Sequence, residues 1–225
     1  NTIWGNKESV LVGDFIFSRA FELMVAAKNL RVLQILSNAS GVIAEGEVLQ
    51  LATQKNMQAT FDMYLAVVEA KTAALFSAAA RAGSVIASAD ETVENSLSDY
   101  GRYLGVAFQM IDDALDYAGT DVALGKNVGD DFREGKMTAP VVFALDRADD
   151  NERKFWRRVI AEGDQRPDDF AQAMEIINAN GALEDTFACA RQYIGKALSA
   201  LDAAPSNIYA DALAELARQS LTRAN

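Results

Sequence analysis

The sequence predicts an all-α protein with a single domain, and three observations lead to this prediction. The first proline is Pro140, so no residue in the preceding part of the chain breaks a helix. The leading half is built largely from Ala, Leu, Val, Glu and Lys, with apolar residues in helical periodicity. Only one long stretch, about residues 119–137, lacks that periodicity. With 225 residues, 50% of them hydrophobic, the chain is long enough to bury one large core.

Helical periodicity predicts nine helices, at about residues 8–28, 31–54, 60–87, 91–118, 138–148, 151–162, 168–180, 182–203 and 206–222. Residues suited to helix ends mark several of these boundaries. We expect Thr60 and Asp90 to cap N-termini, Gly119 and Gly181 to follow C-termini, and Thr138 with Pro140 to open a helix.

The helix predicted at 8–28 carries apolar residues on more than one face, including Leu11, Phe15, Phe21 and Val25. Such a helix is either central to the core of a monomer or shared with a partner chain, and the pattern permits both. The same region is the most apolar segment, but charged residues interrupt it, so we expect no transmembrane span.

An acidic cluster interrupts the apolar run of the helix predicted at 91–118. Asp112 and Asp116 lie on one helical face, Asp113 lies about 100° around from Asp112, and Gln109 precedes them by one turn. Like charges at this spacing repel unless a cation lies between them, and Mg²⁺ prefers such oxygen ligands. The cluster therefore predicts a metal site, and the alternative is a solvated acidic surface.

The stretch after this helix is rich in glycine and charge. Gly125, Gly129 and Gly135 accompany two lysines ten residues apart, Lys126 and Lys136. Ammonium groups and free backbone N–H groups beside metal-binding carboxylates suit a polyanion, and a diphosphate is the simplest such ligand. The alternative is that both lysines are solvated loop charges.

Lys71 and Thr72 lie in an apolar part of the helix predicted at 60–87. A buried, unpaired ammonium group costs several kcal/mol, so Lys71 must either meet an anion or extend its side chain to water.

Composition excludes several functional classes. A net charge of −11 argues against nucleic acid or an anionic membrane surface as a partner. Because the sequence has no histidine, it cannot build a Ser/His/Asp triad or a His-ligated zinc site. The single cysteine, Cys189, cannot form an intrachain disulfide.

Several motifs, taken together, resemble one known family. FQxxDDxLD from Phe108, followed by LGKNxGDDxxEGKxTxP from Leu124, resembles the second aspartate-rich motif and following loop of the trans-isoprenyl diphosphate synthases. The KTAxLF segment from Lys71 resembles an upstream helix of that family. Gly13-Asp14-Phe15 and the GEVLQ segment from Gly46 resemble its long-chain polyprenyl branch. The resemblance extends over essentially all 225 residues.

The resemblance implies a helical bundle of the isoprenoid synthase type, about nine or ten helices around a central cavity. It also implies a prenyltransferase that joins an allylic diphosphate to isopentenyl diphosphate. Its cofactor would be Mg²⁺, and its product would be a precursor of quinone side chains. The catalytic residues implied are Lys71, Thr72, Gln109, Asp112 and Asp113. The metal ligands are Asp112, Asp113 and Asp116, and the substrate-binding residues are Lys71, Thr72, Gln109, Lys126 and Lys136. Asp130 and Asp131 would orient water or lysines.

The family also carries a first aspartate-rich motif and two arginines upstream of the segment that begins here with Asn1, and neither is present in this sequence. We therefore interpret residues 1–225 as one polyprenyl synthase domain that is incomplete at its N-terminus and inactive without the missing segment. The alternatives are a noncatalytic subunit of a heteromeric synthase, a shorter-chain synthase, or a terpene cyclase, which the intact KT, LGKN and EGK elements disfavour. The resemblance implies a homodimer formed through the first two helices. We expect a cytoplasmic protein with at most peripheral membrane contact.

Overall fold

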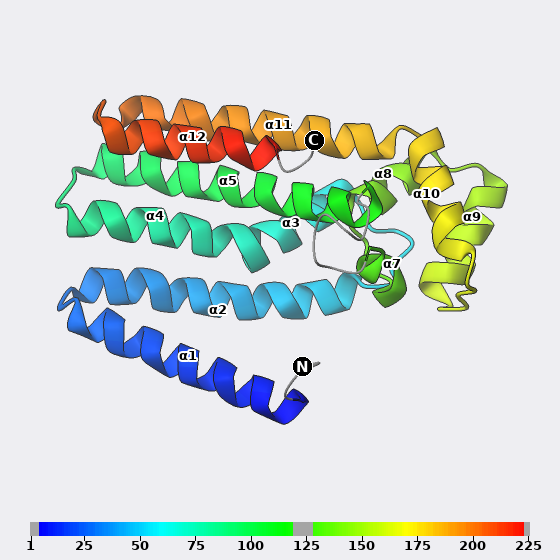
Figure 1. The fold of residues 1–225 in the computed structure, drawn as a ribbon, viewed down its shortest axis with the longest axis horizontal. Helices are drawn as coiled ribbons and strands as arrows, with labels where there is room; N and C mark the ends of the chain where they lie inside the picture. The colour runs from blue at the N-terminus through cyan, green and yellow to red at the C-terminus, as the bar shows by residue number, and fades with distance from the viewer. Residues whose placement is uncertain (1–4, 119–127, 223–225) are drawn as a thin grey trace.

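The computed structural model describes residues 5–118 and 128–222, and every regular element within them is a helix (Figure 1). The predicted all-α class is confirmed for this part of the chain. All nine predicted helices are present, with each end within two residues of its predicted position. The first half holds α1 (Asn6–Ala26), α2 (Leu30–Thr53), α3 (Phe61–Val68), η1 (Glu69–Ala73), α4 (Ala74–Ile86) and α5 (Glu91–Ala118). The second half holds α7 (Asp130–Glu134), α8 (Ala139–Arg147), α9 (Asp150–Trp156), η2 (Arg157–Ala161), α10 (Asp169–Ala179), α11 (Ala182–Ala200), η3 (Leu201–Ala203) and α12 (Ile208–Thr222).

The structure contains features that helical periodicity did not predict. The short helix α7 lies within the stretch that we expected to be irregular, and η1 and η2 are π-helical turns inside longer helices. A π turn arises where one extra residue enters a helix, and such turns are frequent at functional sites. Here η1 contains Lys71 and Thr72.

Helix α5 is the centre of the bundle, with α4 along one side and α11 along the other (Figure 1). Asp90 caps its start as predicted, because the Asp90 carboxylate accepts the backbone N–H of the residue three positions on. Two glycines allow the close approach of α4. A Cβ at Gly101 would lie 2.4 Å from the carbonyl oxygen of Phe76, and one at Gly105 would lie 2.6 Å from Cα of Ala73. Larger residues at these positions would push the helices apart.

Helices α3, η1 and α4 form one continuous helix, which Thr60 caps as predicted by accepting the backbone N–H of Met63 at 3.3 Å. Helix α2 lies against its middle, where a Cβ on Gly46 would be only 2.6 Å from the backbone nitrogen of Lys71. The π turn is therefore held between glycines of α2 and α5.

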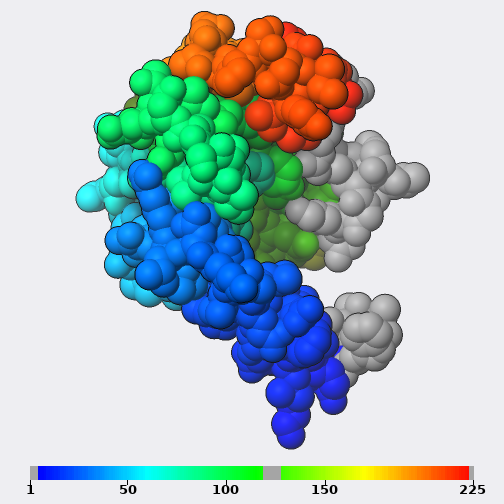
Figure 2. Space-filling model, turned by 90° about the vertical axis from the view of Figure 1, so that its left-hand side faces the viewer, coloured from blue at the N-terminus to red at the C-terminus, as the bar shows by residue number. Residues whose placement is uncertain are grey.

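Helix α1 lies at the edge of the fold and diverges from α2 towards its own N-terminal end (Figures 1 and 2). None of its residues is buried, and Phe15 and Ile16 are 70% and 60% exposed. The alternative in which this helix is central to the core of a monomer is therefore wrong for this chain. The alternative in which a partner covers it stays a prediction.

The second half of the chain closes the core at one end of α5. Gly181 follows α10 with a φ of 65°, which confirms it as the residue after that helix, and Pro140 lies in the first turn of α8 behind Thr138. Gly119 lies outside the described residues. The large side chains fully buried here include Trp156, Phe132, Tyr117, Ile160 and Ile177.

One helix within the described ranges, Phe61–Ile86, is long and apolar enough to span a membrane by length and composition. Helices in the middle of a bundle meet the same criteria, so the expectation of no transmembrane span stays a prediction.

Candidate active site

A cavity of about 490 Å³ lies between α2, α3, η1, the C-terminal half of α5 and the segment around α7. Its described lining includes almost all the predicted site residues, namely Lys71, Thr72, Gln109, Asp112, Asp113, Asp116, Asp130, Asp131 and Lys136. Lys126 lies outside the described residues. The structure thus brings together residues from two motifs that are about 40 positions apart in sequence.

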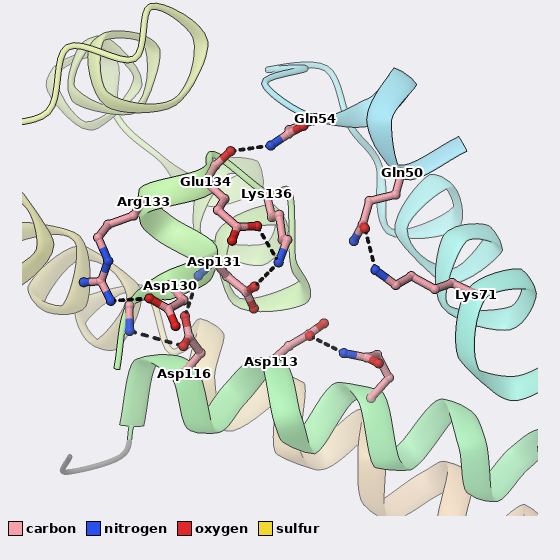
Figure 3. A network of polar contacts seen from close by, with 12 residues as sticks. Gln50, Gln54, Lys71, Asp113, Asp116, Asp130, Asp131, Arg133, Glu134 and Lys136 are labelled. Atoms are coloured by element: carbon pink, nitrogen blue, oxygen red, sulfur yellow. Dashed lines mark hydrogen bonds and ion pairs between the residues drawn. The ribbon is translucent and has the colours of Figure 1, made fainter. Parts of the chain in front are cut away.

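Negative charge dominates this lining. Six carboxylates and two lysines of the described residues line the cavity, and one of these carboxylates, Glu134 of α7, had no predicted role. Figure 3 shows the carboxylates of α5 and α7 on one side and Lys71 with Gln50 on the other. Carboxylates crowded in this way repel one another unless cations lie among them.

Asp113 is the most buried of these acids, with 4% of its surface exposed. Its Oδ2 accepts a hydrogen bond of 2.6 Å from the Tyr64 hydroxyl, and its Oδ1 accepts one of 2.8 Å from Nε2 of Gln109. Burial, followed by the negative charge of Asp131, raises the pKa of Asp113 to about 7. Burial therefore makes the ionised form of Asp113 costly, and a nearby cation would lower that cost.

Asp116 fastens α7 to the end of α5. Its Oδ1 accepts the backbone N–H of Gly129 at 3.2 Å, and its Oδ2 accepts that of Asp131 at 3.0 Å (Figure 3). Gly129 precedes α7 with a φ of 84°, a conformation that favours glycine. Burial and the charge of Asp131 raise the pKa of Asp116, while these N–H groups lower it.

Lys136 draws two acids of the α7 segment together. Its Nζ lies 2.9 Å from Oδ1 of Asp131 and 2.8 Å from Oε2 of Glu134. Burial opposes the charge on Lys136, but the hydrogen bonds to Glu134 and Asp131 outweigh burial and raise its pKa above the ordinary value. Lys136 is therefore a partly buried cation, and the description of it as a solvated loop charge does not fit.

Lys71 ends at the cavity rim, where it meets α2. Its Nζ donates to Oε1 of Gln50 at 2.7 Å and lies 3.1 Å from Oε1 of Glu47, with 31% of the side chain exposed. The ammonium group thus has partners within the protein and still faces the cavity. Next to it, the Thr72 hydroxyl donates to Oε1 of Gln109 at 2.8 Å.

The end of α2 also holds the α7 segment. The Gln54 side chain donates to the carbonyl oxygen of Glu134, and the backbone N–H of Lys55 donates to that of Gly135 at 3.1 Å. One helix therefore contacts both the π turn with Lys71 and the turn that presents Lys136.

Sequence reasoning gave no role to Tyr64, Glu47, Gln50 or Gln54. A signal existed for Glu47 and Gln50, because both lie in the GEVLQ segment. Tyr64 precedes Lys71 by seven residues, about two helical turns, and this spacing would have placed its hydroxyl on the same face. Nothing in the sequence distinguishes Gln54 from a surface residue.

The carboxylates of the cavity fit a metal ion that takes only some of its ligands from the protein. Within residues 5–118 and 128–222, no group of three or more Asp, Glu or Cys side chains is arranged to hold a metal by itself. Mg²⁺ does not require such a group, because it commonly binds one or two carboxylates and takes its remaining ligands from water and phosphate.

Comparison with known proteins agrees with the motifs. The sequence model described as Polyprenyl synthetase matches residues 1–177. The octaprenyl diphosphate synthase of Escherichia coli (strain K12) is 43% identical over 99% of this chain and 69% of its own length. A decaprenyl diphosphate synthase from Rhodobacter capsulatus has a solved structure with a TM-score of 0.92 and 48% identity, over 99% of this chain and 69% of that one. A polyprenyl synthase from Caulobacter crescentus CB15, solved with calcium and isoprenyl diphosphate, has a TM-score of 0.95 and 49% identity, over 100% of this chain and 68% of that one. The chain therefore belongs to the polyprenyl synthetase family, as a long-chain trans-polyprenyl prenyltransferase that elongates its product by prenyl units.

Proposed function

We propose that the cavity binds an allylic diphosphate together with Mg²⁺ and joins its prenyl chain to isopentenyl diphosphate. The observation that carries this proposal is the set of six carboxylates and two lysines that residues 5–118 and 128–222 place around one cavity. A diphosphate cannot approach such a surface without bridging cations, and Mg²⁺ bridges carboxylate and phosphate oxygens. The related structure from Caulobacter crescentus, with its calcium and isoprenyl diphosphate, supports this choice of ligands.

Asp112 and Asp116 would hold Mg²⁺, and Asp113 would belong to the same cluster. Asp112 lines the cavity, whereas Asp113 is buried with both carboxylate oxygens in hydrogen bonds. Asp113 would therefore act mainly through Gln109 and through water on the metal. When bound, the metal would stabilise the negative charge that develops on the diphosphate leaving group.

Lys71 and Lys136 would bind the diphosphate oxygens from opposite sides of the cavity, and Lys126 would join them. Lys136 also holds Asp131 and Glu134 together, so it would keep their charge away from the substrate. Asp130 already pairs with Arg133 at 2.6 Å, which reduces the repulsion further.

The reaction needs no side chain that acts as a general base. The C–O bond of the allylic diphosphate breaks, and its electron pair leaves with the diphosphate. The double bond of isopentenyl diphosphate attacks the allylic cation to form a C–C bond, and the proton then passes to the departing pyrophosphate. Thr72 and Gln109, which line the cavity next to Lys71, would face the cation. This chemistry suits a chain without histidine.

We further propose a homodimer in which α1 is covered by a second chain. The support is that α1 buries none of its residues while exposing large apolar side chains along its length. We also propose a cytoplasmic location with at most peripheral membrane contact, and the net charge of −11 disfavours binding to an anionic membrane surface. The product would serve as a quinone side-chain precursor.

The direct test uses the natural full-length protein with farnesyl diphosphate, isopentenyl diphosphate and Mg²⁺, followed by chromatography of the products. Long-chain polyprenyl diphosphates, lost on chelation with EDTA and restored by Mg²⁺, are the expected result. No product at any Mg²⁺ concentration would favour a noncatalytic subunit, and products that end at C15 or C20 would favour a shorter-chain synthase.

A further inference from the structure

We propose that Tyr64 and Asp113 are positioning residues that fix the direction of the hydrogen bonds at Gln109 and Thr72. As a result, Thr72 presents oxygen lone pairs, and no proton, to the cavity. This inference rests on the proposed function, because it concerns the side chains that would face the allylic cation. Tyr64 has no other assigned role.

Four side chains form one continuous series of hydrogen bonds across three elements. The Tyr64 hydroxyl on α3 donates to Asp113 on α5 at 2.6 Å. Gln109, one turn earlier on α5, donates to the other oxygen of Asp113 at 2.8 Å. Thr72, in the π turn η1, donates to the carbonyl oxygen of Gln109 at 2.8 Å. All four residues line the cavity.

The direction of this series follows from the carboxylate. Oδ1 of Asp113 accepts the hydrogen bond, so Gln109 turns its NH₂ group towards Asp113. The carbonyl oxygen of Gln109 then faces Thr72, and because a carbonyl oxygen also only accepts, the Thr72 hydroxyl must donate its single proton. The remaining groups on that hydroxyl are lone pairs. The orientation of the Gln109 amide therefore follows from the groups that it meets on either side.

Tyr64 supplies the fixed end of the series. Asp113 is 4% exposed and Tyr64 is 6% exposed, so water has little access to either group. Without the phenol, the buried Oδ2 of Asp113 would lack its donor and the carboxylate would be free to rotate towards another one. The bond from Tyr64 also joins α3 to α5, whereas that from Gln109 stays within α5. Tyr64 thus holds the carboxylate in the position from which Gln109 is oriented.

This polarity favours one stage of the reaction. Oxygen lone pairs attract the positive charge that develops on the prenyl chain, and they offer no hydrogen bond to a diphosphate oxygen. A group that interacts mainly with the transition state affects the rate of the chemical step more than the affinity for the substrate. Disturbing the series should therefore slow ionisation while leaving allylic diphosphate binding nearly unchanged.

The test compares Tyr64→Phe with Tyr100→Phe in the natural full-length protein. Tyr100 is a matched control, because it is 2% exposed and also donates one hydrogen bond, to the carbonyl oxygen of Leu213 at 2.8 Å, outside the cavity. Single-turnover rates with farnesyl and isopentenyl diphosphates report the first C–C bond. Calorimetry with farnesyl thiolodiphosphate and Mg²⁺ reports binding. We expect Tyr64→Phe to slow the single turnover by about tenfold with less than a twofold change in Kd, and Tyr100→Phe to change neither by more than twofold.

Asp113→Asn provides a second measurement. Unlike Tyr64→Phe, it removes no hydrogen-bonding group and instead replaces a carboxylate oxygen by an NH₂ group. An asparagine that kept its amide oxygen at the Tyr64 hydroxyl would present its NH₂ to Gln109, which would reverse the Gln109 amide and turn the Thr72 proton towards the cavity. The single turnover should slow by about a hundredfold, while the Mg²⁺ concentration that gives half the maximal rate stays within twofold. A large rise in that concentration would instead make Asp113 a metal ligand and contradict the positioning role.

Two further outcomes would overturn the proposal. One is a single-turnover rate for Tyr64→Phe equal to that of the wild type, and the other is an equal loss in rate and in affinity. If the wild-type protein itself transfers no prenyl group, the proposed function fails, and that result is distinct from either of these.

Discussion

Gly46 provides a sharp test of how the site is built, because it is the point where α2 touches the π turn. In Gly46→Ala, the new Cβ would lie 2.6 Å from the backbone nitrogen of Lys71 and 2.9 Å from the carbonyl carbon of Ala70. Ordinary contacts begin near 3.4 Å, so one helix must move by several tenths of an ångström. The atoms that would have to move are backbone atoms, which cannot swing aside as a side chain can.

The size of the effect follows from two opposing terms. Replacing glycine by alanine inside a helix stabilises a protein by about 1 kcal/mol, whereas forcing an extra carbon into a packed contact costs about 1–3 kcal/mol. Gly195→Ala isolates the first term, because Gly195 lies within α11 and a Cβ there meets nothing within 4 Å. The two variants should therefore differ in free energy of unfolding by about 1–3 kcal/mol, with Gly46→Ala the less stable.

Urea unfolding measures this difference, and steady-state kinetics shows whether the site moves with the helix. We expect kcat/KM for the allylic diphosphate to fall in Gly46→Ala, because Lys71 and its bond to Gln50 lie at the displaced contact. Gly195→Ala should keep normal kinetics. If Gly46→Ala were as stable and as active as Gly195→Ala, the close contact between α2 and the π turn would not exist in solution.

Four other predictions follow from the site and the edge helix. Asp112→Ala should abolish turnover because it removes a metal ligand. It should cost little stability because it relieves repulsion between carboxylates. Near-normal activity at saturating Mg²⁺ would contradict the metal assignment. Lys136→Gln should lower kcat/KM for the allylic diphosphate by about ten- to a hundredfold, whereas Lys154→Gln, on an exposed part of α9, should change it by less than twofold. The pKa of Asp113, raised to about 7, means that the folded state keeps a proton that the unfolded state loses near pH 4. In EDTA the free energy of unfolding should therefore fall between pH 4 and 7, and urea titrations should show a flatter profile for Asp113→Asn. Phe15→Asp should shift the protein from dimer to monomer in sedimentation velocity runs, and an unchanged dimer would remove α1 from the interface.

Much of the fold was predictable because each long helix carries its own pattern and its own ends. Thr60, Asp90 and Gly181 lie at the boundaries where their chemistry places them. The π turn at Lys71 was not predictable, because the sequence around it continues the helical pattern without interruption. It packs between α2 and α5, whose glycines approach it only in the folded protein.

The acidic and lysine residues of the candidate site were predictable, but their hydrogen-bond partners were not. Asp112, Asp113 and Asp116 look equivalent in sequence and all line the cavity, yet Asp113 is buried against Tyr64 and Asp116 holds the start of α7. These differences depend on which neighbours reach each carboxylate, and the neighbours come from elements up to 49 residues away. Spacing along one helix carries no information about them.

The π turn η1 also sets the phase of the helix that contains it. Because a π turn holds one residue more than an α turn, the same residues wound as an unbroken α-helix would place α3 about 100° out of phase with α4. Tyr64 bonds to Asp113 on α5 before the turn, and Phe76 packs on Phe108 of α5 after it, with 5.5 Å between the ring centres. An unbroken α-helix of the same residues could not keep both contacts. The extra residue of the π turn therefore lets both ends of one helix contact α5.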